Sequence, residues 1–150
     1  MRLTWIGTMA VLGAVACGGG EQQANQTQTQ TAATPAAGGP VVEVRITGDG
    51  STKAAFEPAA LTIAPGTTVR FINASGGPHN IAFYGDSIPT GAGTVLNAAM
   101  ANRMDNLSGA FVTTPNETYD VSFAGAPTGT YKGFCLPHVA MGMKIAITVQ

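Results

Sequence analysis

Near its end the chain runs Cys135-Leu-Pro-His138-Val-Ala-Met141-Gly-Met143, which gathers a thiol, an imidazole and two thioethers into one short segment. The chain has two histidines, and the other one, His79, lies in the turn Gly76-Gly-Pro-His79-Asn80. Thiolate, thioether and imidazole groups are ligands that transition metals prefer in proteins. Because His79 is far away in the sequence, a metal site that uses it needs a fold that brings two distant segments together.

These side chains match one kind of metal site in particular. Two histidines, one cysteine and a weakly bound methionine are the ligands of a blue-copper electron-transfer site. Cys135 and His138, at positions i and i+3, suit a loop in which a strand ends and the chain turns back over the metal. The sequence therefore predicts one copper ion bound by His79, Cys135, His138 and a methionine. Spacing alone leaves Met141 and Met143 as equal candidates for the fourth position.

Two neighbours of these residues are expected to support the site. Pro137 stiffens the loop and lacks a backbone donor, which leaves the ligand sulfur with fewer hydrogen bonds. Asn80 directly follows His79, so its backbone N–H is a candidate donor to the Cys135 sulfur, and its side chain is placed to join the two ligand loops.

Other roles for these residues fit less well. A single buried cysteine often acts as a small apolar side chain, and a single histidine is often structural. A thiol nucleophile activated by His138 is chemically possible, but the tight loop leaves little room for a substrate. Zinc accepts cysteine and histidine, but a thioether is a poor zinc ligand. The combination of Cys135 with both histidines in Gly/Pro-rich turns favours copper.

The composition excludes some classes of protein and leaves one domain. The 150 residues carry a net charge of −1 with few charged side chains, which argues against binding to nucleic acid. A second cysteine, Cys17, would suggest a disulfide with Cys135. It lies, however, in a segment of a different kind, so Cys135 is expected to be free.

The first residues are typical of a bacterial lipoprotein signal. Arg2 is followed by Leu3–Val15, an uncharged segment too short for the roughly 20 residues of a membrane span. Ala14-Val-Ala-Cys17 then resembles a site at which the cysteine becomes the lipidated first residue. We therefore predict a signal peptide at 1–16, lipidated Cys17 with a flexible linker at 17–39, and an exported protein anchored to a membrane, in the periplasm or on the outer surface.

The domain at 40–150 is predicted to be all-β. Short strands separated by Gly/Pro turns indicate a Greek-key β-sandwich. The segment near 86–108 is rich in Ala, Leu and Met and predicts a short helical or irregular insertion, with Val95 and Ala99 at helical spacing and Met100 and Met104 as packing residues. The strands are expected at 41–46, 68–73, 79–84, 117–123, 129–135 and 143–149.

Three segments together resemble one known family. Phe56–Phe71, His79-Asn80 and the Cys135–Met143 loop are similar to the corresponding parts of cupredoxins, and most of all of pseudoazurin and plastocyanin. The resemblance covers roughly 41–149 with an insertion. It implies a type 1 copper site in a cupredoxin-like sandwich. It also implies that Met143, the farther methionine, is the axial ligand, with Met141 as its neighbour and the lower-probability alternative.

The resemblance implies that the protein carries single electrons between redox partners outside the cytoplasm. Docking is then expected through an apolar patch of Val139, Ala140 and Met141 around His138, with the protein a monomer. A pseudoazurin-like ring of docking lysines does not carry over, since the domain has three lysines. The segment from 85 to 115 is also longer than its counterpart.

Two functions other than electron transfer have to be weighed: copper delivery and catalysis. The same ligands would serve a protein that sequesters or delivers copper without electron transfer. An oxidase or nitrite reductase would need further histidine-rich copper sites, and both histidines are already assigned. We therefore do not expect an enzyme.

Overall fold

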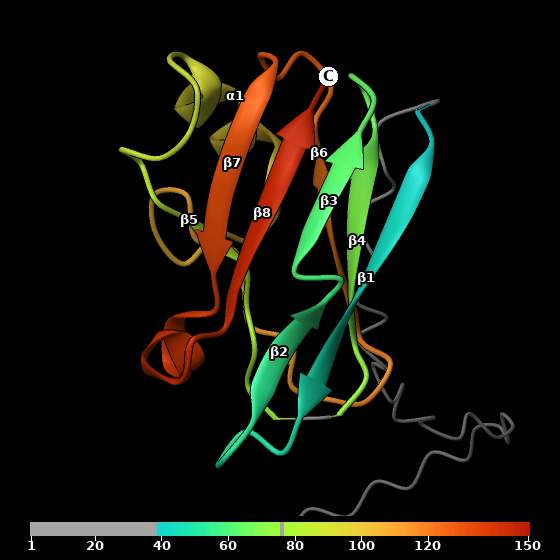
Figure 1. The fold of residues 1–150 in the computed structure, drawn as a ribbon, viewed down its shortest axis with the longest axis vertical. Coiled ribbons are helices and arrows are strands. Elements are labelled where there is room, and N and C mark those ends of the chain that lie inside the picture. The colour runs from blue at the N-terminus through green and yellow to red at the C-terminus, as the bar shows by residue number, and fades with distance from the viewer. Residues whose placement is uncertain (1–38, 76) are drawn as a thin grey trace, which may run out of the picture. The chain divides into compact units, whose positions relative to one another are not determined.

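A computed structural model describes residues 39–75 and 77–150 (Figure 1). The predicted signal peptide, Cys17 and nearly all of the predicted linker lie outside the described residues, so these assignments stay predictions. Within the described part, α1 is too short and insufficiently apolar to cross a membrane, as is every other helix there.

The fold consists of two four-stranded sheets packed face to face (Figure 1). The first sheet has the order β2-β1-β4-β6, and the second has the order β3-β8-β7-β5. The β1·β4 and β3·β8 pairs are parallel, whereas the other pairs are antiparallel. The predicted all-β sandwich is thereby confirmed. The strands are β1 (Val41–Gly48), β2 (Ala54–Glu57), β3 (Ala60–Ile63), β4 (Thr68–Asn73), β5 (Ala82–Phe83), β6 (Thr118–Ser122), β7 (Gly129–Phe134) and β8 (Lys144–Val149).

Alternating apolar residues build the core between the sheets. In β1 the side chains of Val44 and Ile46 are buried, and in β8 those of Ile145, Ile147 and Val149 are buried. Successive side chains of a strand point to opposite faces, so this alternation turns one face of each sheet inward. The strand expected at 117–123, which forms β6, alternates in the same way and buries one face.

A tight turn leads into β4. The Thr67 N–H donates to the Ala64 carbonyl at 3.2 Å, and Gly66 has a φ of +83°. Proline at the second position and glycine at the third suit a turn that requires a positive φ there. Ala64-Pro65-Gly66 therefore ends β3 and starts β4 where the sequence indicates.

The predicted insertion contains one short helix, α1 (Ala92–Ala99). Its buried face is formed by Ala92 and Leu96, and Met100 continues that face at the same spacing of four residues. Val95, which the sequence placed at helical spacing, packs partly buried against the core, and Met100 is buried as predicted, whereas Leu96 at the centre of the buried face was not singled out. Met104 is half exposed, so its prediction as a packing residue is wrong.

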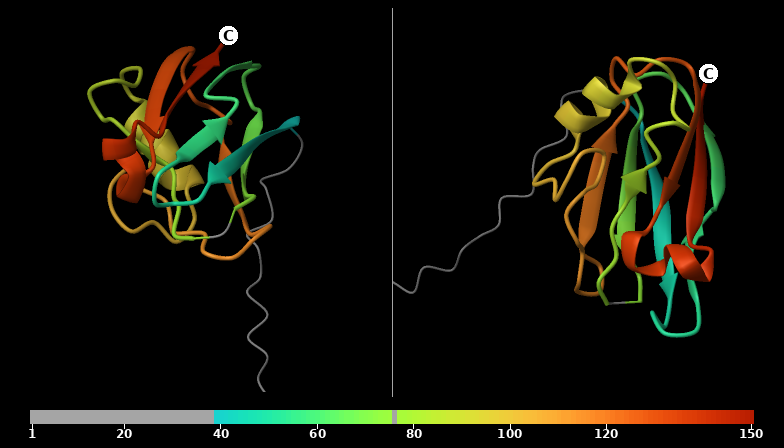
Figure 2. Two further views of the ribbon diagram at one scale, coloured as in Figure 1. Left: turned by 60° about the horizontal axis from the view of Figure 1, so that its bottom comes forward. Right: turned by 90° about the vertical axis from the view of Figure 1, so that its left-hand side faces the viewer.

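The two irregular parts of the chain lie at opposite ends of the sandwich (Figures 1 and 2). One end carries α1, and the other carries the 3₁₀ helix η1 (Leu136–Met141) and the hairpin between β1 and β2. The predicted strand 79–84 is reduced to the two residues of β5. His79 instead forms an isolated bridge with Val112.

Candidate metal centre

His79 is fixed by backbone bonds to a distant part of the chain. Its N–H donates to the Val112 carbonyl at 3.0 Å, and the Val112 N–H donates back at 2.8 Å. The turn before it is held by the side chain of Asn73, whose Nδ2 donates to the carbonyls of Gly77 at 3.1 Å and Val112 at 3.3 Å. Asn73 is fully buried at the end of β4. The orientation of His79 is therefore a property of the tertiary fold.

Cys135 and His138 are held by a short loop that bonds to itself. The Cys135 N–H donates to the Met143 carbonyl at 3.1 Å, and the Met143 N–H donates to the His138 carbonyl at 3.2 Å. Pro137 is in the first turn of η1, where its missing N–H costs nothing. Gly142 ends the helix with a φ of +84°, a conformation that glycine adopts without strain. The predicted reversal of the chain after β7 is thus present.

The two loops bring three ligand-type side chains together. The Cys135 Sγ lies 3.7 Å from Nδ1 of His79 and 3.4 Å from Nδ1 of His138. The two imidazole rings are 4.6 Å apart, centre to centre, at 44°. One ligand atom from each of the three residues falls within 4.8 Å of the others, and all three residues are buried.

These separations fit one metal ion. A divalent ion about 2.0 Å from an imidazole nitrogen and about 2.3 Å from a thiolate sulfur, with about 120° between the two bonds, separates the nitrogen and the sulfur by about 3.7 Å. The two sulfur-to-nitrogen distances, 3.7 and 3.4 Å, are close to that value. A trigonal set of two imidazoles and one thiolate is the donor set of type 1 copper. The residues therefore fit the predicted copper.

The surroundings of the Cys135 thiol shift its pKa in opposite directions. Burial raises its pKa, whereas hydrogen bonds from the backbone N–H groups of Asn80 and His138 lower it. Both donors favour the thiolate, which is the form that binds a metal. The Asn80 N–H is the donor that the sequence suggested for this sulfur.

The Asn80 side chain joins the two loops, as expected. Its Oδ1 accepts from the Leu136 N–H at 2.8 Å, immediately after Cys135. Its Nδ2 donates to Ser108 Oγ at 3.2 Å and to the Gly109 carbonyl at 3.3 Å. Asn80 is 1% exposed, so these bonds satisfy a polar group that water does not reach.

The two methionines of the loop lie in different surroundings. Met143 is 1% exposed and belongs to the core cluster, whereas Met141 is 38% exposed. Burial beside Cys135 and His138 is what an axial ligand requires, and a solvent-facing side chain does not meet that requirement.

The His138 ring is close to the surface but covered. It is 5% exposed, and the exposed side chains of Leu136 and Met141 flank it in sequence on η1. On the hairpin between β1 and β2, a methyl group built on Gly50 would lie 3.7 Å from Nε2 of His138. The hairpin is therefore in contact range of the outer edge of the ring, which the sequence did not indicate.

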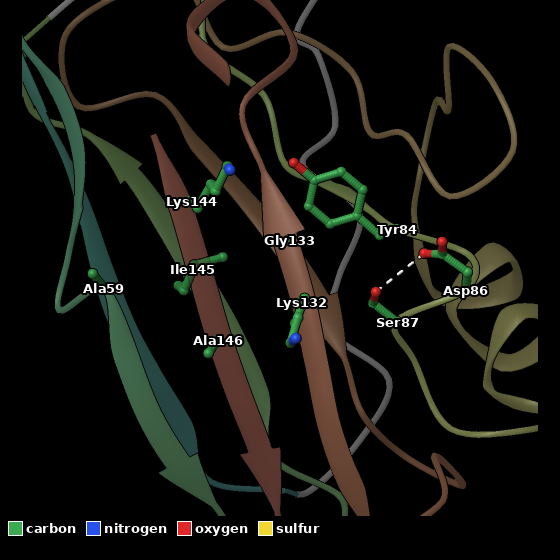
Figure 3. A pocket seen from close by; sticks show the side chains of 9 residues that line it. All are labelled: Ala59, Tyr84, Asp86, Ser87, Lys132, Gly133, Lys144, Ile145 and Ala146. Atoms are coloured by element: carbon green, nitrogen blue, oxygen red, sulfur yellow. Dashed lines mark hydrogen bonds between the residues drawn. The ribbon is translucent and has the colours of Figure 1, made fainter. Parts of the chain in front are cut away.

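A surface hollow of about 630 Å³ lies away from these residues, on the outer face of β7 and β8 (Figure 3). The side chains of Lys132, Lys144 and Tyr84 line it, and the Tyr84 ring stacks on Phe134 with ring centres 4.3 Å apart. It has no histidine or cysteine in its lining, so it does not offer the metal ligands described above.

Sequence reasoning missed some of the residues that hold the site. Asn73 was noticeable at the end of a predicted strand before a Gly/Pro turn, a place where an asparagine side chain often bonds the backbone. Ser108, Gly109 and Val112 gave no such signal. They contact His79 and Asn80 across a long loop, and a single sequence does not show such pairing.

Comparisons with known proteins agree with this geometry. Residues 42–150 match the model of a family described as copper binding proteins, plastocyanin/azurin family. A plastocyanin from Scenedesmus fuscus is 44% identical over 95 residues, which cover 63% of this chain and 86% of that protein. A plastocyanin from Sambucus nigra is 38% identical over 110 residues, which cover 73% of this chain and all of that protein.

Solved structures of plastocyanin and pseudoazurin are also similar to this chain. An oxidised plastocyanin from the fern Dryopteris crassirhizoma is similar with a TM-score of 0.55 and 29% identity, covering 73% of this chain and all of that one. Pseudoazurin from Methylobacterium extorquens is similar with a TM-score of 0.51 and 26% identity, covering 73% of this chain and 74% of that one.

Proposed function

The chain belongs to the plastocyanin/azurin family of copper-binding proteins and is a type 1 copper electron carrier, and we propose that His79, Cys135 and His138 bind its single copper ion. The observation that carries the ligand assignment is the convergence of three buried donor atoms within 4.8 Å. When bound, copper would supply a one-electron couple between Cu(II) and Cu(I).

The protein side of electron transfer is a rigid ligand set. His79 is held by two backbone bonds to Val112, and Cys135 by the bond to Met143. Because these backbone bonds fix both ligand segments, the ligand atoms would need little movement to accommodate either oxidation state. Soft thiolate stabilises Cu(I) and imidazole accepts both states, so one fixed geometry serves the whole cycle.

Met143 is proposed as the axial ligand. Its burial beside Cys135 and its backbone bond to His138 support this choice, as does the exposure of Met141. A weakly bound Met143 thioether would adjust the reduction potential of a copper ion held by His79, Cys135 and His138.

The electron is proposed to pass through His138. This ring is the ligand nearest to solvent, and the exposed Leu136 and Met141 form an apolar surface on η1. Val139 and Ala140 complete the surface that we expect redox partners to contact. A small apolar patch suits brief encounters, in which a partner must leave as readily as it binds. The carrier is proposed to act as a monomer.

Export and anchoring complete the proposal. The sequence of the signal-like segment supports lipidation of Cys17, which would hold the domain at a membrane facing the periplasm or the outer surface. The linker at 17–39 is proposed to separate the domain from the membrane by roughly 25 Å. Globomycin treatment, which blocks lipoprotein signal cleavage, would cause the precursor to accumulate; an unchanged mature form would contradict the anchor.

We propose that the protein carries electrons without catalysing a reaction of its own. In the described part of the chain, His79, Cys135 and His138 form the one group of three or more histidine, cysteine or acidic side chains placed to hold a metal. A copper oxidase or nitrite reductase would need another such group. The similarity of the chain to plastocyanins supports electron transfer without substrate chemistry.

Copper titration tests the ligand assignment. Purified protein is expected to bind one equivalent of Cu(II) and to develop an intense visible band from thiolate-to-copper charge transfer. Cys135→Ser is expected to lose the band, whereas Ser122→Ala, a substitution of similar size on β6, is expected to keep it. A colourless wild-type protein, or a band that survives Cys135→Ser, would contradict the proposal.

A further inference from the structure

The long loop between β5 and β6 runs beside the metal centre. Its residues 105–112, which we call the brace, pair with 79–83 through an irregular antiparallel ladder. The Gly109 N–H donates to the Ile81 carbonyl at 2.9 Å, and the Phe83 N–H donates to the Leu107 carbonyl at 2.9 Å. The brace, which the sequence left without a role, is therefore hydrogen-bonded along the segment from His79 to Phe83.

The brace fixes the orientation of one buried carboxamide. Asn80 Nδ2 donates to Ser108 Oγ at 3.2 Å and to the Gly109 carbonyl at 3.3 Å. An amide nitrogen can only donate and an amide oxygen can only accept. If the carboxamide turned over, its oxygen would meet the Gly109 carbonyl and its nitrogen would meet the Leu136 N–H. The brace therefore selects the orientation in which Oδ1 faces Leu136.

This orientation controls two groups at the Cys135 sulfur. Oδ1 of Asn80 accepts from the Leu136 N–H at 2.8 Å, so it holds the peptide that follows Cys135. The backbone N–H of the same Asn80 donates to the Cys135 sulfur. Hydrogen bonds to a ligand sulfur reduce the electron density that it gives to the metal, and so they adjust the reduction potential.

The brace is itself held by helix α1. Asn97 Oδ1 accepts from the Leu107 N–H at 2.8 Å and from Arg103 Nη1 at 3.0 Å. Leu107 has a φ of +57°, a conformation that costs a residue with a side chain about 1 to 2 kcal/mol. Its side chain is buried, so packing and the Asn97 bond offset that cost. The strained turn places the next residue, Ser108, against Asn80.

We propose that Ser108 is a positioning residue of the metal centre: its hydroxyl, together with the Gly109 carbonyl, locks the Asn80 carboxamide and thereby sets the hydrogen bonding around the Cys135 sulfur. The effect on the potential rests on the proposed function, whereas the effect on the Leu136 amide does not. A chain of contacts then runs from Asn97 on α1 through Leu107 and Ser108 to the thiolate.

The first measurement uses the metal-free protein. Amide hydrogen exchange at Leu136, followed by NMR, reports whether its N–H stays bonded to Asn80. Ser108→Ala is expected to raise the exchange rate at Leu136 about tenfold, the effect of one weakened hydrogen bond. Ser108→Thr keeps a hydroxyl and is expected to restore the wild-type rate. Ser122→Ala removes a comparable serine bond, to the Ala124 N–H, and is expected to leave Leu136 unchanged.

The second measurement uses the copper-loaded protein. Ser108→Ala is expected to lower the reduction potential and shift the visible band, because the sulfur loses part of its hydrogen bonding; Ser108→Thr reverses both changes. Should Ser108→Ala fail to fold, Asn97→Ala is expected to give the same two changes from farther away.

The outcomes separate the two proposals. Unchanged Leu136 exchange in Ser108→Ala, or a Ser108→Thr protein that behaves like Ser108→Ala, would overturn the role of Ser108. Faster Leu136 exchange in a protein that binds no copper would support the role of Ser108 and refute the proposed function.

Discussion

The two segments that meet at the metal centre are held in different ways. The Cys135–Met143 loop closes on itself through bonds between residues at most eight positions apart, such as Cys135 N–H to Met143 O. The segment around His79 depends on Val112 and Asn73, and Asn80 depends on Ser108. One half of the centre is thus a local structure, and the other half is a product of the tertiary fold.

The difference explains how such a site remains rigid near the surface. The local loop has to lie at the edge of the sandwich, where η1 is partly exposed, because a partner must reach it. In the distant segment, His79 and Asn80 are fully buried, and both are hydrogen-bonded to residues of the brace. The buried segment of His79 and Asn80 can therefore hold the short, accessible loop of Cys135 and His138 in position, because Asn80 bonds to Leu136.

The largest expected effect comes from removing one imidazole from each segment. His79→Gly and His138→Gly are both expected to lose the intense visible band. Added imidazole is expected to restore it in His138→Gly, since that ring lies close to the surface at 5% exposure, and to restore it poorly in His79→Gly, whose ring is fully buried. Absorbance during an imidazole titration measures both.

A band that persists in His79→Gly without imidazole would show that the interior segment does not supply a ligand. Equal rescue of the two variants would show that the contrast in access between the segments is wrong.

Next in size is the loss of the side chain that joins the segments. Asn80→Ala is expected to lower the free energy of unfolding of the metal-free protein by about 1 to 3 kcal/mol, because the partly buried Leu136 N–H loses its acceptor. Gln150→Ala, which removes a carboxamide at an exposed position, is expected to change it by less than about 0.5 kcal/mol. Urea unfolding measures both values, and similar losses in the two variants would contradict the joining role of Asn80.

A smaller effect is expected within the local loop. Met143→Leu conserves volume and should cost less than about 1.5 kcal/mol, but it removes the proposed axial sulfur and is expected to shift the visible and EPR spectra. Met141→Leu, at an exposed position, is expected to leave both spectra unchanged. If only Met141→Leu alters the spectra, the two methionines have been assigned in reverse.

The smallest effect concerns the hairpin beside His138. Hydrogen bonds from the Thr52 side chain, and then from the N–H groups of Lys53, Thr52 and Ser51, hold the pKa of Asp49 far below its usual range. A carboxyl group whose pKa is depressed on folding stabilises the fold above its unfolded pKa of about 3.9, and this contribution is lost as the pH falls toward the folded pKa.

Asp49→Asn lacks this titration. Between pH 5 and pH 3 the wild type is therefore expected to lose more stability than the variant, as measured by urea unfolding at each pH. An equal loss in both proteins would show that the Asp49 carboxylate does not organise the hairpin.

The sequence predicted the local half of the centre better than the distant half. Cys135, His138 and the reversal after β7 follow from residue types and from Pro137 and Gly142, whose backbone preferences are intrinsic. The strands were likewise predicted within one or two residues where apolar residues alternate, as in β4 and β8. Local patterns carry that information because each residue's preference acts on its own neighbours.

The distant half needed the structure. The expected strand 79–84 is mostly an irregular ladder, because its partner is the brace, and the pairing of Val112 with His79 has no sequence signature. The packing role of Met104 was misjudged for a related reason, since the core decides which apolar residues are buried. The assignment of the copper ligands stays a proposal, although the three predicted donors do converge.

Electron self-exchange tests the central claim most directly. NMR spectra of mixtures of the Cu(I) and Cu(II) protein report how fast an electron passes between two copies. We predict rapid exchange that broadens the resonances of residues near His138, with copper retained through repeated cycles of oxidation and reduction. Exchange too slow to detect, together with ready loss of Cu(I) to the chelator bicinchoninate, would contradict an electron carrier and indicate copper storage or delivery.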